Sequence, residues 1–369
     1  MVTRLLRLTL LGALATTALC GSHAWETKLQ EPADTRPLPV DAAGYAIKDP
    51  SREHQFRKRW IGLRTDSTES LWPEKTISYC YSTSEAKDKL AKFIKQATML
   101  WHQAGLHKDV YKYKEVANPG GSCTGYSNRA NTLVINVRTD KPYMDSTVGL
   151  PLLNARDTEY KGPTMNLDYE NARFAWTARG QAVVATIAHE FGHAWGLYHE
   201  HQNRYFWNAP VSFANGVIFG DKFDCAAIPG YMEVLQKAIA DGNGDERLLC
   251  VSKRMADKYN FTAGQWLPWR TFKSKNSYYA GQSYDDVDWE SIMLYGSSDG
   301  SATGTPILLR NDGQSFQSNF RPSLGDVEGI RTLYEPANSF SGGFPVLPNS
   351  SKSPFYTKFI NMFKKNKGC

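Results

Sequence analysis

The alternation of apolar and polar residues predicts a strand followed by a helix near the start of the folded region. Residues Thr76–Tyr81 have the composition of a strand. Ser82 and Glu85 form a capping-box pattern, and Gly105 ends the apolar repeat that follows. The repeat places six residues on one inner face of the predicted helix: Ala86, Leu90, Phe93, Ile94, Ala97 and Trp101. A strand that leads into an amphipathic helix indicates a layered α+β core.

Further apolar runs predict two more strands and two more helices. Strand signals lie at 131–137 and 164–169, and an apolar run over 182–187 opens a second helix. Within the first strand signal, the segment TLVINVRT, residues 132–139, is compatible with an edge strand and with a strand buried in the core. The second half of the chain has few regular signals, although 232–239 has the pattern of a short helix.

The helix predicted after 182–187 carries the segment HEFGHAWGLYH, which runs from His189 to His199. On a helix His189 and His193 share one face, so both rings can bind one metal ion, with Glu190 beside the open coordination position. Gly196 tolerates a positive φ, which allows the chain to turn and bring His199 back as a third ligand. Three protein ligands leave one position for water, as in a catalytic zinc site.

A structural interpretation of the same residues is a buried helix whose histidines are satisfied inside the core. It offers no other partner for three clustered imidazoles that directly follow the apolar run 182–187. We therefore favour the metal site.

These residues resemble the zinc-binding segment of the metzincin endopeptidases. In SIMLYG, Met293 matches the methionine turn of that clan. Glu200, directly after the third histidine, and Tyr295 match the astacin family within it. Weaker matches begin at Leu71, in LWPEKTISYCYS, and at Leu324, in LGDVEGIRTLYE. The resemblance therefore covers roughly residues 72–335.

The resemblance implies an α+β fold with two lobes around an active-site cleft. The first lobe would hold a twisted mixed sheet and the active-site helix, and the second would be irregular. In astacins an edge strand of this sheet binds the peptide substrate through its main chain, and 132–139 is our candidate. The separation between His199 and Met293 exceeds that of a minimal astacin and implies an inserted region at about 205–285. HQNRYFWN departs from the family pattern after the third histidine; Arg204 partly substitutes there.

The site that the resemblance implies holds one Zn²⁺ between the three histidines. Glu190 acts as the general base toward the attacking water and then as the acid toward the leaving amine. Tyr295 donates a hydrogen bond to the oxyanion. Gly196, Glu200 and Met293 support the site, with Glu200 binding the mature amino terminus or a water network.

The expected activity is that of a secreted zinc endopeptidase acting on proteins or peptides. Two alternatives stay open: another secreted metzincin family with a convergent Glu200, and a metal-binding scaffold that no longer turns over. The presence of both Glu190 and Tyr295 argues against the scaffold. His201, next to Glu200, is expected to point away from the metal.

Segments outside the catalytic domain, 60–335, have different compositions. Residues 1–24 resemble a signal peptide, against a buried helix as the alternative. Residues 25–59 are interpreted as a pro-segment that ends at the tribasic run 57–59, which is a processing site or a solvated charge cluster. Residues 336–369 form a basic, loosely ordered tail.

The cysteines fit an exported protein. Apart from Cys20, the chain can pair Cys80 with Cys123 and Cys225 with Cys250, which leaves Cys369 over. No cysteine spacing matches a structural zinc finger. Two sequons, at Asn260 and Asn349, are potential glycan acceptors.

Composition limits the partners. The 369-residue chain has a formal charge of +6 and a pI near 8.8, spread without a nucleic-acid motif. After the amino-terminal segment no run is apolar enough to span a membrane. DGNGDE, residues 241–246, resembles a calcium loop but lacks its required glycine and glutamate, so a solvated turn is favoured. We expect a monomer that binds neither nucleic acid nor the membrane interior.

Overall fold

A computed structural model describes the chain from Trp60 to Glu335 in the ranges 60–63, 71–116, 123, 129–138, 144–150, 162–168, 178–203, 206–207, 219, 223–242, 246–268, 277–280, 287–301, 303–310 and 312–335. The expected signal peptide, pro-segment, tribasic run and tail lie outside these residues, as do Arg204, Asn349 and Cys369. Their interpretation stays a prediction from the sequence.

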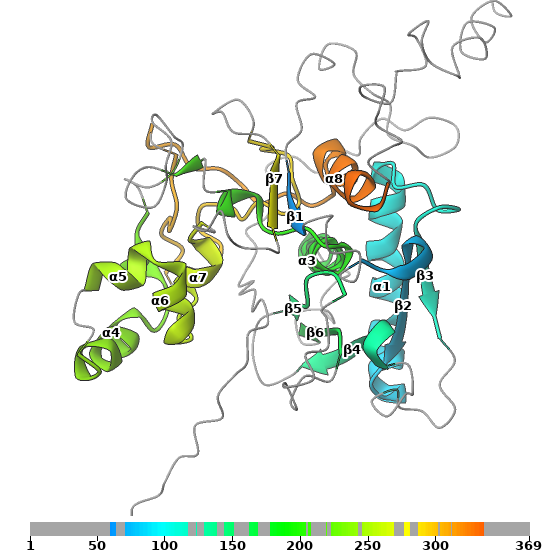
Figure 1. The fold of residues 1–369 in the computed structure, drawn as a ribbon, viewed down its shortest axis with the longest axis horizontal. Helices are drawn as coiled ribbons and strands as arrows, with labels where there is room; N and C mark the ends of the chain where they lie inside the picture. Colours follow the sequence, from blue (N-terminus) through cyan, green and yellow to red (C-terminus); the bar gives the residue numbers. More distant parts are fainter. Residues whose placement is uncertain are drawn as a thin grey trace, which may run out of the picture.

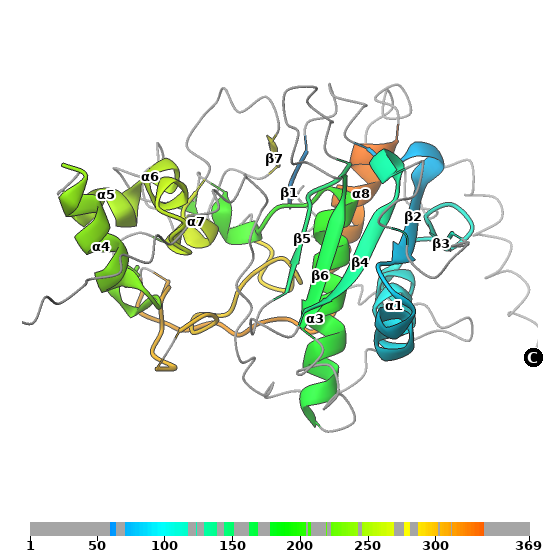
Figure 2. The same cartoon turned by 90° about the horizontal axis from the view of Figure 1, so that it is seen from below.

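A five-stranded mixed sheet organises the first part of the molecule. Its strands are β2 (Thr76–Tyr81), β3 (Lys112–Glu115), β4 (Leu133–Arg138), β5 (Asp145–Ser146) and β6 (Thr164–Asp168). The order is β3-β2-β4-β6-β5, and only β5 runs antiparallel to its neighbour (Figure 2). The predictions of strands at 76–81, 131–137 and 164–169 are confirmed to within two residues at each end.

Strand β4 lies inside this sheet and forms no edge. It pairs with β2 on one side and with β6 on the other, and Leu133, Val134 and Ile135 are buried. The prediction that 132–139 forms the peptide-binding edge is therefore wrong, and the buried-strand alternative holds. Apolar side chains on consecutive residues are what a strand enclosed on both faces requires. In the described part of the sheet, β5 forms the edge beyond β6.

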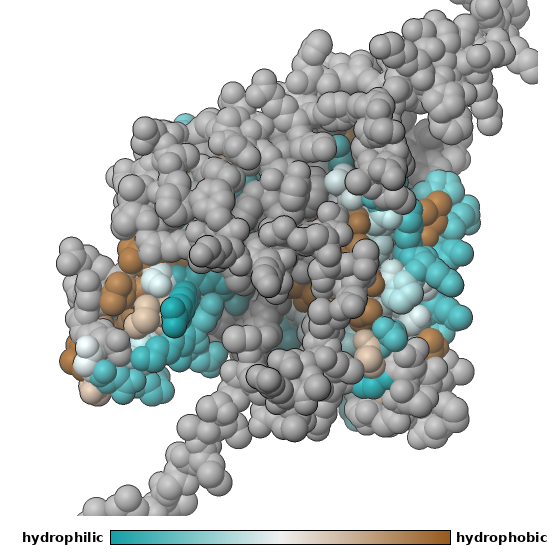
Figure 3. Space-filling model, viewed as in Figure 1, coloured by the Kyte–Doolittle hydropathy of each residue, from teal (hydrophilic) through white to brown (hydrophobic). Residues whose placement is uncertain are grey.

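Helix α1 (Ser84–Ala104) packs against the sheet through the face that the sequence predicts. All six predicted inner residues are buried, and the outer face is hydrophilic (Figure 3). The amino-terminal cap is Thr83 rather than Ser82, because its hydroxyl accepts the Ala86 N–H at 3.0 Å. Gly105 ends the helix with φ at 116°.

Helix α3 (Ala178–Trp195) runs beside α1, and two indole groups fix its position. Trp101 donates its Nε1–H to the Ala188 carbonyl at 2.8 Å, and Trp72 donates to the Ala194 carbonyl at 2.7 Å. Both tryptophans are buried in one core together with residues of α8 (Leu324–Tyr334). These two hydrogen bonds restrain α3 both along its axis and in its rotation about that axis, and α3 carries the first two histidines.

A second group of helices lies away from the sheet (Figure 1). These are α4 (Tyr231–Ala240), α5 (Glu246–Val251), α6 (Lys253–Lys258) and α7 (Ala263–Trp266). They enclose a separate apolar core that includes Trp207, Phe219 and Trp266. The helix predicted at 232–239 is confirmed, but the region is more regular than the irregular lobe that was expected. Helices of four to six residues are too short to show a periodic pattern.

A short two-stranded ribbon joins the first described residues to a segment far along the chain. Strand β1 (Trp60–Leu63) pairs antiparallel with β7 (Ser277–Ala280), and Gly62 forms a bridge with Leu197 in the turn after α3. Because β1 and β7 are more than 200 positions apart and only four residues long, the sequence pattern did not predict this ribbon.

Each of the two regions contains one disulfide. Cys80 bonds to Cys123 beside the sheet, and Cys225 bonds to Cys250 among the second group of helices. Both are the pairings expected from the sequence. In the part of the chain that is described, no helix combines the length and the apolar character needed to cross a bilayer.

Candidate metal centre

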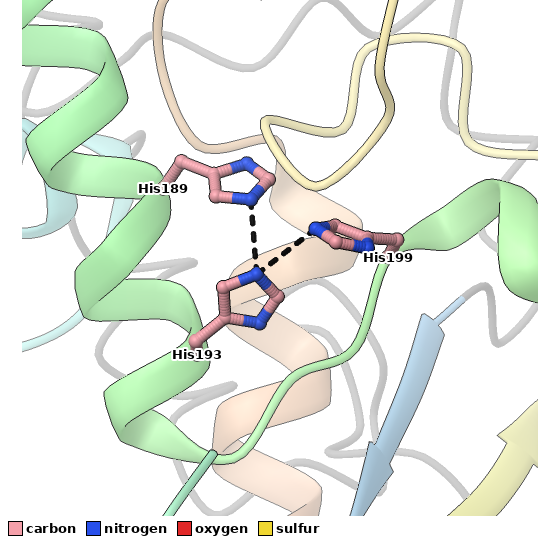
Figure 4. A group of neighbouring side chains, drawn as sticks. All are labelled: His189, His193 and His199. Carbon is pink, nitrogen blue, oxygen red and sulfur yellow. Dashed lines mark hydrogen bonds between the residues drawn. The ribbon is translucent and has the colours of Figure 1, made fainter. Parts of the chain in front are cut away.

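Three histidines converge at the end of α3 (Figure 4). His189 and His193 lie one turn apart on the helix, and Gly196, with φ at 109°, reverses the chain so that His199 returns to them. The turn is a Schellman motif, because Gly196 N–H bonds to the His193 carbonyl and Leu197 N–H to the Gly192 carbonyl, at 2.8 and 3.0 Å. Nε2 of His193 lies 3.0 Å from Nε2 of each other histidine.

The outer ring nitrogens of the first two histidines face carbonyl oxygens. Nδ1 of His189 lies 2.7 Å from the Ile292 oxygen, and Nδ1 of His193 lies 2.8 Å from the Leu197 oxygen. A carbonyl oxygen can only accept, so each Nδ1 carries the hydrogen. In a neutral imidazole the other nitrogen, Nε2, then presents its lone pair.

The third histidine carries its hydrogen on Nδ1 as well, but the acceptor is a side-chain oxygen. Nδ1 of His199 lies 3.2 Å from Oε1 of Gln202. The amide nitrogen of Gln202 donates to the carbonyls of Gly264 and Leu267, at 3.1 and 3.2 Å, which establishes that the oxygen faces His199. His199 therefore also presents an Nε2 lone pair to the cluster.

This donor set fits a metal ion. Three lone pairs at contact distance repel one another unless a cation lies between them. Two nitrogens bound at 2.0–2.1 Å to a tetrahedral ion are about 3.3 Å apart, close to the 3.0 Å observed. The three histidines are buried, with ligand atoms all within 4.8 Å of one another. Such a group can bind a metal ion.

Burial keeps the three imidazoles in the state that binds metal. Loss of solvation lowers the pKa of His193 to about 4. It also lowers the pKa of His189 and of His199 well below the usual range, and the neighbouring imidazoles add to this shift. At neutral pH all three rings are therefore uncharged, as coordination requires.

The two residues expected to be catalytic are buried beside this cluster. Glu190 follows His189 on α3 and is fully buried. The Tyr295 ring centroid lies 4.3 Å from that of His199 and 5.9 Å from that of His189, and the ring is 3% exposed. The sequence-predicted acid and phenol thus lie in the same buried region as the three histidines.

His201 is directed toward the second group of helices. Its ring stacks on His199 with an interplanar angle of 12°, while its Nε2 lies 3.0 Å from the Gln265 carbonyl in α7. This nitrogen is engaged outside the cluster, as expected from the sequence.

The segment around Met293 contacts both α3 and Glu200, the residue after the third histidine. Glu200 donates its N–H to the Met293 carbonyl at 2.8 Å, and its Oε1 accepts the Asp288 N–H at 3.1 Å. A Cβ on Gly192 would collide with the Met293 sulfur, so α3 and this segment touch at a position without a side chain. Glu200 thus has a structural role here. Its expected contact with a mature amino terminus involves residues outside the described ranges.

Asp326 was missed by the sequence analysis. Its carboxylate accepts the Ser291 hydroxyl at 2.6 Å and the Ile292 N–H at 2.9 Å. It also completes a capping box with Ser323 at the start of α8. The Ser-x-x-Asp spacing in the sequence predicts the cap, but no local pattern shows that the same carboxylate anchors Ile292, whose carbonyl orients His189.

A cavity of about 640 Å³ lies elsewhere, between α1 and strands β2 and β3. Its lining carries Lys108, Lys112, Lys114 and His102, and none of the three clustered histidines. Lysines along an exposed edge strand also have a protective role, because they discourage pairing with other chains. The candidate site is therefore placed at the histidines, where converging donors rather than volume define it.

Comparisons with known proteins give little to add to this geometry. No protein-family model matches the chain, and no curated protein matches it. Among solved structures, the crystal structure of myroilysin is 18% identical, with a TM-score of 0.38, over 81% of this chain and 100% of that chain. The GM1-bound form of the ECX AB5 holotoxin is 15% identical, with a TM-score of 0.24, over 43% of this chain and 66% of that one. Likenesses at these scores support no conclusion about this protein.

Proposed function

We propose that this protein is a zinc-dependent endopeptidase of the metzincin type, similar to the astacins, that cleaves proteins or peptides outside the cell. The observation that carries the proposal is the convergence of three Nε2 lone pairs, each set by an acceptor for the opposite nitrogen. In a packed core three lone pairs that face one another would repel, whereas a cation between them can bind all three. Three neutral imidazoles in tetrahedral spacing are a common zinc ligand set.

The chain's own residues have distinct roles in the proposed reaction. A bound zinc ion supplies a Lewis acid that activates water and polarises the scissile carbonyl. Glu190 accepts the proton of the attacking water and returns it to the leaving amine. The Tyr295 hydroxyl donates a hydrogen bond to the developing oxyanion. Its ring contacts with His199 and His189 support this role, because they keep the phenol beside the proposed ligands.

The substrate would bind along the edge of the sheet nearest to the histidines. An extended peptide adds to a sheet edge through its main chain. Strand β5 is the edge next to β6, and just after it Gly149 donates its N–H to the His193 carbonyl at 2.8 Å. Residues 144–150 therefore replace 132–139 as our candidate for peptide binding.

The two disulfides support the proposal of export, because such bonds persist in oxidising compartments. We retain the signal peptide at 1–24, the pro-segment at 25–59 with processing near Arg59, and the catalytic domain at 60–335, with its insertion at about 205–285, as parts of the same proposal.

A peptide-library experiment tests the function. The full-length protein, cut at the tribasic run by a processing protease, is assayed with one equivalent of zinc, beside a chelated sample and Glu190→Gln. We expect cleavage only with metal, and a fall of about 10²- to 10⁴-fold in Glu190→Gln, whose zinc content stays at one equivalent. Equal cleavage by wild type and Glu190→Gln would refute the enzymatic role. Stoichiometric zinc without any cleavage would favour the metal-binding scaffold instead.

A further inference from the structure

Gln202 connects the third histidine to the second group of helices. The residue is 2% exposed, and its side chain forms three hydrogen bonds, each with a defined donor and acceptor. The oxygen receives the His199 Nδ1–H, and the two amide hydrogens go to the Gly264 and Leu267 carbonyls. Only one orientation of the amide satisfies all three bonds. If its oxygen and nitrogen changed places, its NH₂ group would face the His199 N–H and its oxygen would face two carbonyl oxygens.

We propose that Gln202 is a positioning residue that fixes the tautomer and ring orientation of His199. The carbonyls of Gly264 in α7 and of Leu267 just after it hold Gln202 in the one orientation able to do this. The inference rests on the proposed metal-dependent function. Through it, the helices at 225–267 act on metal binding without contributing a ligand.

The three histidines differ in how their Nδ1 acceptors are supplied, which makes Gln202 the sensitive point. His193 uses a carbonyl four residues away in its own turn, and His189 uses a backbone carbonyl anchored by Asp326. Both acceptors belong to the main chain. Only His199 depends on a side chain, which has free rotations of its own unless its neighbours restrain it.

The neighbours of His199 reinforce this link to α7. His201 stacks on its ring and bonds to the Gln265 carbonyl, and the Trp266 ring packs edge-on against Tyr295 at 5.1 Å. Consecutive residues of α7 therefore contact Gln202, His201 and Tyr295. A displacement of α7 would reach the third ligand by several contacts, of which Gln202 is the one that controls the lone pair.

The test compares Gln202→Met, which keeps the length of the side chain but removes its polar atoms, with Gln202→Glu, which keeps an acceptor for His199. Asn166→Leu is the matched control, since Asn166 also bridges two polar side chains, Asn136 and Asp145, but touches no histidine of the cluster. Zinc affinity is measured by competition with a chromophoric chelator, and the unfolding temperature of the metal-free protein is measured for each variant.

We expect Gln202→Met to weaken zinc binding by about 10- to 100-fold. Gln202→Glu keeps the acceptor for His199 but loses the donors to Gly264 and Leu267, so it should weaken zinc binding by a smaller factor, less than about 10-fold. Asn166→Leu should lower the unfolding temperature without changing zinc affinity. Histidine ¹⁵N spectra of the metal-free wild type should show His199 with its hydrogen on Nδ1, and Gln202→Met should show a mixture of tautomers.

Two outcomes would overturn the inference. One is unchanged zinc affinity in Gln202→Met; the other is equal loss in Gln202→Met and Gln202→Glu, which would mean that only the bonds to α7 matter. Peptidase activity is measured on the same samples. A wild type that binds zinc but cleaves no peptide would refute the proposed function and leave the role of Gln202 standing.

Discussion

The region around the sheet and the region around α4–α7 contribute different parts of the candidate metal site. The first supplies His189, His193 and His199 from one helix and its turn. The second supplies the carbonyls that hold Gln202, which lie 62 and 65 positions further along the chain. Ligands are thus local in sequence, whereas the groups that orient their protons are distant. The site is completed only when both regions are folded against each other.

Metal removal should have the largest effect on activity, and it should change hydrogen exchange differently in the two regions. With the ion chelated, we expect peptidase activity to fall below detection. Hydrogen exchange should rise in 196–203, 263–267 and 287–295, where single hydrogen bonds converge on the ligands. The sheet should stay protected, because its ladder and core are independent of the ion. Equal deprotection of β2 and β4 would contradict the division into two regions.

Tyr295→Phe should have the next largest effect, and only on catalysis. Loss of one oxyanion donor costs about 3 kcal/mol in transition-state stabilisation, or about 10²-fold in kcat. The ring contacts with His199 and Trp266 stay possible for phenylalanine. Steady-state kinetics beside zinc titration check this, and zinc affinity should be unchanged. A variant as fast as wild type would leave Tyr295 with a packing role alone.

Gly192→Ala tests how closely α3 approaches the segment that carries Met293 within the first region. The added methyl group would collide with the Met293 sulfur and lie 3.1 Å from Trp101. Overpacking of this kind costs about 1–3 kcal/mol, measured as the free energy of unfolding in urea. A shorter side chain at 293 should recover part of this loss. Gly105→Ala is a useful contrast, since a methyl group there meets nothing within 4 Å but is strained by φ at 116°.

The smallest predicted effect concerns pH and the segment that carries Met293. Burial raises the pKa of Asp288 from 3.8 to about 7, with the Asp326 carboxylate adding to the shift. A raised pKa in the folded state means that stability is complete below pH 3.8 and is lost as the pH rises through about 7. Asp288→Asn should therefore gain stability relative to wild type, on the order of 1 kcal/mol, between pH 5 and 8.

This pH difference is read from urea unfolding of both proteins across that range. Burial lowers the pKa of His193 to about 4 and that of His201 to about 3, so these residues add a pH dependence of opposite sign, because their unfolded forms take up protons as the pH falls below about 6.5. This contribution is shared by wild type and variant and cancels in the difference. A difference that stays constant with pH would contradict a raised pKa of Asp288 within this range.

The sequence predicted the first region better than the second, for a physical reason. The six inner residues of α1 follow a 3.6-residue period over a long helix, so burial could be predicted from spacing alone. The three histidines followed in the same way from one helix and one glycine. The cap shifted by one residue, from Ser82 to Thr83, because both have a hydroxyl and only the local geometry selects between them.

Strand pairing and long-range hydrogen bonds could not be predicted from the sequence pattern. Whether 132–139 lay at an edge depended on which strands flank it, and that is decided by topology rather than by composition. Gln202 has no local feature that distinguishes it from ordinary polar residues, and the Ser-x-x-Asp spacing of Asp326 predicts only its helix cap. Their importance comes from partners 34 and 62 positions away, which only the folded chain brings together.

The Schellman turn at Gly196 and the acceptors around it bear on protein engineering. A designer who transplants only the eleven residues from His189 to His199 into another scaffold would carry the ligands but leave two of the three imidazoles without their acceptors. A faithful graft would also need Gln202, the backbone at 264–267, and the loop at 291–293 with its aspartate anchor. The portable unit is therefore a set of four chain segments rather than a single motif.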